Sequence, residues 1–191
     1  CMDDKIIVSN KTALKAKYGS DGLATIVKAV DALIKADGKR GIKSRLVFLD
    51  QAGTMHGFKG RAVTDVTDRA QNKHAIDAII RKANPDYLMI LGATDVVPHQ
   101  DMKNPVFDPP DDPDKSADGD LPYACDTPYS RDIATFKGPT RVVGRLPDLT
   151  KANEPSHLLA LIDIAAKYRS RDVTDYGTYF GLSTHSWRKS T

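Results

Sequence analysis

Three short apolar runs, alternating with stretches of helical periodicity, constrain the fold of this chain most strongly. The runs are Arg45–Leu49, Tyr87–Leu91 and Arg141–Leu146. Continuous apolar runs of this length are typical of strands that are covered on both faces. Apolar residues recur at helical steps over 23–34 and 68–83, before the first and second runs. This alternation predicts a three-layer α/β fold with a mostly parallel sheet and right-handed crossovers.

The finer pattern predicts further elements around these runs. Lys5–Ser9 reads as a first strand, and a short helical turn through Leu14 and Tyr18 is expected to break at residues 19–22, before the helix that starts at Leu23. Asn153 is expected to cap a last helix, which a strand at 179–182 would follow. Six apolar residues should lie on adjacent, buried parallel strands: Val47, Leu49, Leu88, Ile90, Val142 and Val143.

Length and charge limit the classes of protein to consider. The 191 residues suit one domain, 1–191, and the formal net charge is +3 with scattered basic residues, so nucleic-acid binding is not expected. No apolar stretch approaches 18 residues, so no membrane span is expected. Residues 1–15 lack the apolar core of a signal peptide, which favours a cytoplasmic location. Two cysteines, Cys1 and Cys125, suggest neither a disulfide framework nor a metal-binding pair.

Residues 99–140 form a long segment rich in Pro and Asp, expected to be irregular and either functional or mobile. Residues 114–120 resemble the start of an EF-hand calcium loop, but Cys125 stands where the bidentate Glu belongs. A solvated acidic loop is the default interpretation of this segment, and a looser calcium site is preferred over a true EF-hand. The expected calcium ligands are Asp112, Asp114 and Asp118, with Asp108 and Asp111 beside them.

Three segments in this order resemble the gingipain family of caspase-fold cysteine peptidases. The first is Pro85–Gly92 followed by Asp95-Val96-Val97-Pro98, an apolar strand, a glycine and a short turn. The second is Asp120-Leu121-Pro122-Tyr123, and the third is the Val-Gly-Arg strand Arg141–Pro147, whose following helix ends near Tyr168-Arg169. The resemblance covers roughly residues 43–182.

This resemblance implies a cysteine endopeptidase whose sheet is built from two consecutive parts. The family's catalytic Cys and His belong to the second part, so they are expected beyond residue 191, and the remaining half of the peptidase would be a partner of this chain. Asp120 then matches the carboxylate beside the catalytic His. Asp126 matches the carboxylate that binds a basic residue of a polypeptide substrate before the cut, where bidentate pairing with Arg is favourable. No cofactor is implied.

Other interpretations remain open. Cys125 and His99 could form a dyad within the chain, and His185 follows a predicted strand. His56, His74 and His157 are expected at the surface. No glycine-rich phosphate-binding motif is present. Rival classes are a catalytically silent α/β module that binds a partner or regulates a neighbouring domain, and a flavodoxin-like or receiver-type domain, against which the long loop argues.

Overall fold

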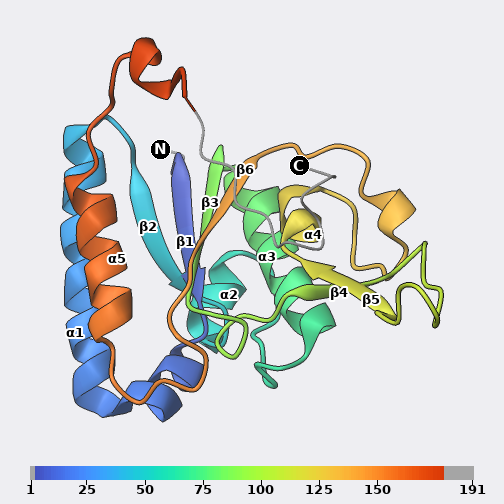
Figure 1. The fold of residues 1–191 in the computed structure, drawn as a ribbon. Coiled ribbons are helices and arrows are strands. Elements are labelled where there is room, and N and C mark those ends of the chain that lie inside the picture. Colours follow the sequence, from blue (N-terminus) through green and yellow to red (C-terminus); the bar gives the residue numbers. More distant parts are fainter. Residues whose placement is uncertain (1–2, 179–191) are drawn as a thin grey trace.

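A four-stranded parallel sheet forms the centre of the computed structural model, which describes residues 3–178 (Figure 1). Its spatial order is β2-β1-β3-β6. The strands are β1 (Lys5–Ser9), β2 (Ser44–Phe48), β3 (Tyr87–Leu91) and β6 (Val142–Leu146). All three neighbouring pairs are parallel, so the predicted α/β fold is confirmed.

Burial differs sharply between the central strands and β6. All five residues of β1 are buried, because β1 lies between β2 and β3 and both of its faces are covered. Leu88 and Ile90 of β3 are buried as predicted. Val142 is 61% exposed, however, and Val143 is only half-buried. The prediction of burial was wrong for β6, because this strand is the edge of the described sheet.

Helices cover both faces of the sheet. Helix α1 (Lys11–Lys39) and helix α5 (Ser156–Lys167) pack side by side on one face, and α2 (Ala52–Gly57) and α3 (Arg69–Ala83) lie on the other (Figure 1). The predicted break between residues 19 and 22 is a kink within α1. Gly19 there has φ 69° and ψ −177°, a conformation that interrupts the helix at one position and that glycine adopts without steric cost.

The ends of α3 lie where their capping residues predict, but the start of α5 does not. The Asp68 side chain accepts a hydrogen bond from the backbone N–H of Gln71 and caps α3, which ends at the left-handed Asn84. The predicted cap of α5 at Asn153 was wrong. Proline disfavours helical geometry in the residue before it, so α5 begins after Pro155, and the Glu154 carboxylate accepts from the Ser156 N–H at 3.0 Å.

The connection between β3 and β6 contains more regular structure than its composition predicts. It holds an antiparallel hairpin of β4 (Gln100–Lys103) and β5 (Ser116–Gly119), the short helix α4 (Leu121–Ala124) and a 3₁₀ turn at Ile133–Thr135. A second 3₁₀ turn, Val173–Tyr176, follows α5. The tip between β4 and β5 projects from the body of the protein (Figure 1). Residues 99–140 therefore have a small buried cluster of their own, Met102, Cys125 and Phe136, while Tyr123 belongs to the main core.

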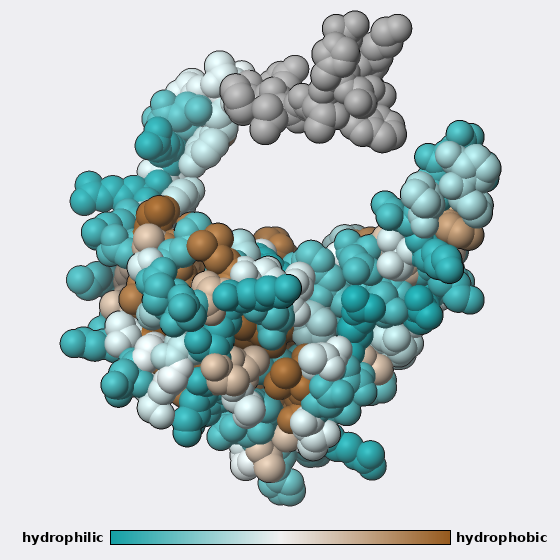
Figure 2. All heavy atoms as spheres, turned by 60° about the horizontal axis from the view of Figure 1, so that its bottom comes forward, coloured by the Kyte–Doolittle hydropathy of each residue, from teal (hydrophilic) through white to brown (hydrophobic). Residues whose placement is uncertain are grey.

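The carboxyl ends of the parallel strands lie toward the bottom of Figure 1. Figure 2 turns this side forward and shows mainly hydrophilic side chains, with separate apolar patches near the middle. The predicted strand at 179–182 and His185 lie outside the described residues. Within residues 3–178, no helix has the length and apolar character needed to cross a membrane.

Candidate functional site

A mostly buried polar site lies at the carboxyl end of β6, where Asp120 meets Arg145. Asp120 directly precedes α4, and Arg145 is the last residue but one of β6. The guanidinium donates from Nε to Oδ2 at 2.8 Å and from Nη2 to Oδ1 at 2.6 Å. This bidentate pair is mostly buried, with 10% of the Arg145 side chain and 23% of the Asp120 side chain exposed.

Arg145 also ties the pair to the end of β3. Its Nη1 donates to the carbonyl oxygens of Gly92 at 2.8 Å and Val97 at 2.9 Å. Gly92 has φ 112°, and a Cβ at this position would lie 2.6 Å from Val96 Cβ, so only glycine fits the turn after β3. Arg145 of β6 therefore links the predicted carboxylate to the segment that follows β3, and the sequence interpretation had not singled out this arginine.

His99 lies at the rim of this site. Its Nε2 is 3.9 Å from Asp120 Oδ2, and 35% of its side chain is exposed. Next to it, the buried Tyr123 hydroxyl donates to the Pro98 carbonyl oxygen at 2.8 Å and accepts from Gln100 Nε2 at 2.7 Å. Burial raises the pKa of Tyr123 far above its usual range, so this phenol stays neutral and both donates and accepts a hydrogen bond in a fixed position.

Cys125 does not form the alternative dyad with His99. It is 1% exposed, within the cluster of Met102 and Phe136, and burial raises the pKa of its thiol. No hydrogen bond between Cys125 and His99 occurs in the part of the chain that the structure describes. A buried thiol with a raised pKa lacks the thiolate character that a nucleophile needs.

Asp126 pairs with a buried arginine instead of presenting a free carboxylate. Arg141 Nη2 donates to Asp126 Oδ1, and this hydrogen bond holds the pKa of Asp126 below its usual value. Only 3% of the Arg141 side chain is exposed, against 63% for Asp126. Asp126 lines a pocket of about 380 Å³ together with Asp77 and Arg81.

A buried ion pair lies behind this pocket. Lys73 and Asp77 are one turn apart in α3, the lysine is fully buried, and its Nζ also donates to the Cys125 carbonyl oxygen at 3.3 Å. Burial lowers the pKa of Lys73 and raises that of Asp77. The sequence interpretation missed this pair, because a lysine and an aspartate on a helix are ordinarily solvent-facing.

The acidic residues of the β4–β5 hairpin bond to neighbouring groups of the protein. Asp112 Oδ2 accepts from Asn104 Nδ2 at 2.9 Å, its Oδ1 accepts from the Asp114 N–H at 3.2 Å, and Asp118 pairs with Arg69 at 3.4 Å. Among residues 3–178, no group of three or more His, Cys, Asp or Glu side chains is arranged to hold a metal ion. The EF-hand interpretation was wrong, because Ser116–Gly119 is an antiparallel strand.

The sheet's topological switch point, between β1 and β3, is filled by side chains. Ser9 Oγ donates to the Leu91 carbonyl oxygen at 2.8 Å, and Asn10 Nδ2 donates to Asn72 Oδ1 at 2.8 Å and to the Val96 carbonyl oxygen at 2.9 Å. Ligands of flavodoxin-like folds bind at such a point. Because Ser9 and Asn10 are fully buried, the geometry does not favour the flavodoxin-like interpretation.

A second polar network lies at the same edge of the sheet. Asp148 follows β6, is buried, and accepts from the Tyr18 hydroxyl and the Ala93 N–H. Lys17 lies 2.7 Å from Asp148 and 2.9 Å from Asp95, so one ammonium bridges two carboxylates. Burial, and then the Asp148 contact, raise the pKa of Tyr18 far above its usual range.

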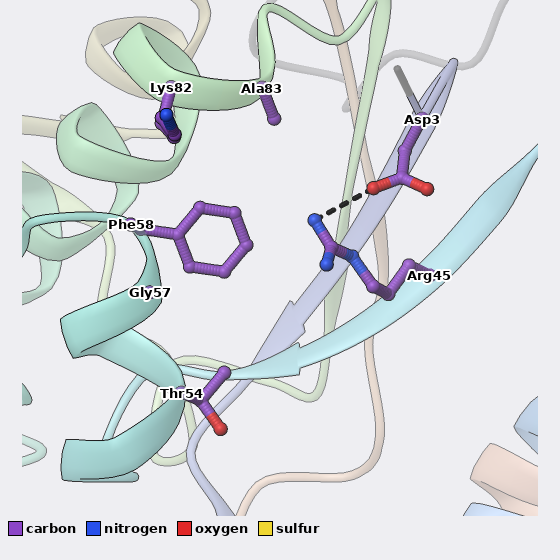
Figure 3. Close-up of a pocket in the computed structure, with 7 residues that line it drawn as sticks. All are labelled: Asp3, Arg45, Thr54, Gly57, Phe58, Lys82 and Ala83. Carbon is purple, nitrogen blue, oxygen red and sulfur yellow. Dashed lines mark ion pairs between the residues drawn. The ribbon is translucent and has the colours of Figure 1, made fainter. Parts of the chain in front are cut away.

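A further pocket, of about 390 Å³, lies at the opposite, amino-terminal edge of the sheet (Figure 3). Arg45 of β2 points its guanidinium toward Asp3 at 2.7 Å and lies 4.9 Å from the centre of the Phe58 ring. The charges of Arg45 and Asp3 are thus paired with each other, and Lys82 is the other charged residue that lines this pocket. The three histidines expected at the surface, His56, His74 and His157, are exposed.

No family model matches the chain, and searches of curated proteins and of solved structures find no match either.

Proposed function

We propose that this chain is the half of a caspase-fold cysteine endopeptidase, similar to the gingipain type, that does not carry the catalytic dyad. The observation that carries the proposal is the position of β6. This strand is the edge of the described sheet, its Val142 is 61% exposed, and its carboxyl end holds the Arg145–Asp120 pair. An apolar edge beside an ordered polar site is suited to receive further strands that bring catalytic groups.

In this proposal the dyad-bearing half packs against β6. Other apolar side chains near that side of the sheet are also exposed, including Tyr87, which pairs with Val142 in register, and Ile164 of α5 at 65%. Asp120 would then lie beside the incoming His, already oriented by Arg145. The burial of Cys125 supports a nucleophile that comes from elsewhere.

Asp126 is the proposed carboxylate for a basic substrate residue. Its Oδ1 is held by Arg141, and the exposed remainder of the carboxylate faces solvent. Because the Arg141 cation already offsets much of its charge, we expect Asp126→Ala to lower kcat/KM for Arg and Lys substrates by about tenfold, which corresponds to about 1.4 kcal/mol.

A catalytically silent α/β module is the second candidate. Both proposed site carboxylates, Asp120 and Asp126, already have internal arginine partners, which favours a structural role for each. This candidate predicts that no product of the gene cleaves peptides.

The test compares residues 1–191 with the longest product of the same gene on fluorogenic peptides that end in Arg, Lys or Asp. We expect residues 1–191 to be inactive, and the longer product to cleave after Arg or Lys and to be inactivated by iodoacetamide. Cys125→Ser should leave that activity unchanged. Loss of activity in Cys125→Ser would contradict the proposal, and an inert longer product would favour the silent module.

A further inference from the structure

A basic groove of about 700 Å³ lies between α3 and residues 59–64, the segment that follows α2. Every charged residue that lines it is cationic: Lys59 and Arg61 come from the segment, and Arg81 comes from α3. His74 of α3 also lines the groove, and Ala62 and Ala78 are its apolar lining residues. The volume falls in the range of small-molecule sites.

The two arginines of this groove have no aspartate partner among the described residues. Ten arginines lie within residues 3–178, and six of them form ion pairs with aspartates. Of the four described arginines without such a pair, Arg169 and Arg171 follow α5, and Arg61 and Arg81 both line this groove. Arg81 acts electrostatically on Asp77, one turn earlier in α3, without an ion pair between them. Unpaired cations are therefore gathered at this groove, in a protein whose surface is rich in aspartate.

The groove is also preformed. Gln71 Oε1 accepts from the N–H of Thr64 at 2.8 Å and from the N–H of Asp65 at 3.2 Å, which fixes the far end of the segment on α3. At the near end, Gly60 approaches the helix so closely that a Cβ would lie 2.6 Å from Ala78 Cβ. A site that is rigid before binding loses less conformational freedom when a ligand arrives.

We propose that this groove binds a phosphorylated small molecule of about mononucleotide size. Guanidinium groups donate paired hydrogen bonds that match phosphate oxygens, and the lysine adds a point charge. The alanine surface suits the uncharged body of such a ligand. The cations surround a hollow and not a flat surface, which favours a small molecule over an acidic protein. This site is independent of the proposed peptidase function.

The test is isothermal titration calorimetry of residues 1–191 with ADP, pyrophosphate, adenosine and a Glu-rich peptide. We expect ADP and pyrophosphate to bind and adenosine not to bind at the same concentration. Arg61→Gln should weaken ADP binding at least tenfold, and Arg61→Lys should weaken it less. The matched control is Lys35→Gln, which removes one exposed positive charge from α1 and should leave ADP binding unchanged.

Three results would overturn the proposal. The first is no binding of ADP or pyrophosphate at millimolar concentration. The second is an equal loss of ADP binding in Lys35→Gln and Arg61→Gln, which would show a nonspecific charge effect. The third is tighter binding of the Glu-rich peptide than of ADP, which would make the groove a surface for an acidic polypeptide. Because Arg61 is exposed, its variants should fold, and circular dichroism checks this.

Discussion

Replacing Arg145 by leucine should destabilise the protein more than the change Asp120→Asn at its partner. The substitution removes four hydrogen bonds, two to the Asp120 carboxylate and one each to the carbonyl oxygens of Gly92 and Val97. Removing one partner of a buried ion pair typically costs roughly 3–5 kcal/mol. Because Asp120 keeps 23% of its side-chain exposure and some hydration, we expect the lower end, about 3 kcal/mol.

Asp120→Asn should lower the free energy of unfolding by less, about 1–2 kcal/mol. The amide oxygen still accepts a hydrogen bond, and Arg145 keeps both of its carbonyl partners. The control is Asp163→Asn, which breaks an exposed i,i+4 pair with Lys167, with side chains 56% and 75% exposed. Exposed pairs of this kind contribute at most about 0.5 kcal/mol.

Urea denaturation followed by circular dichroism gives the free energy of unfolding of all three variants, and thermal unfolding gives their Tm. For a domain of this size, about 3 kcal/mol corresponds to a fall in Tm of roughly 6–12 °C. If Arg145→Leu and Asp163→Asn have equal effects, the Arg145 site is an ordinary surface bridge and the reasoning fails. If Asp120→Asn costs as much as Arg145→Leu, the two carbonyl hydrogen bonds contribute nothing.

Three further predictions follow from other parts of the fold. In a variant whose other cysteine is serine, Cys125 should react with a thiol reagent far more slowly in the native protein than in urea, because burial shields it and raises its pKa. Asp126→Asn should cost about 1 kcal/mol at neutral pH, and the difference from wild type should vanish as pH falls through the lowered folded pKa of Asp126, because protonation ends its pairing with Arg141. Gly60→Ala should destabilise by roughly 1–3 kcal/mol, since its Cβ would meet Ala78 Cβ at 2.6 Å.

Each of these has a result that contradicts it. Rapid labelling of native Cys125 would show that the thiol is accessible. A stability difference for Asp126→Asn that persists in acid would mean that the carboxylate charge is not the cause. Gly53→Ala is the control for Gly60, because nothing lies within 4 Å of its Cβ position, and it should be neutral or slightly stabilising. Equal effects at both glycines would refute the steric argument.

The sequence by itself determined the elements whose signals are local. The apolar run Tyr87–Leu91 became strand β3, in which Leu88, Ile90 and Leu91 are buried, and α3 begins at the Asp68 cap and ends at Asn84 as the residue types indicate. These elements depend on hydrophobic periodicity and on side chains that bond to nearby backbone groups. A sequence window of a few residues is therefore enough to predict them.

The tertiary structure decided which residues are buried at the sheet edge and which charges meet. Val142 belongs to an apolar run like that of β3, yet it is exposed because strand order places β6 at the edge of the described sheet. Asp120 and Asp126 were identified as candidates, but their pairing with Arg145 and Arg141 depends on how the segment after β3 folds back on β6. Asp120 and Arg145 are 25 positions apart in the sequence, and Asp126 and Arg141 are 15 apart. Local sequence patterns do not predict such pairs, because only the packing of the elements brings the partners together.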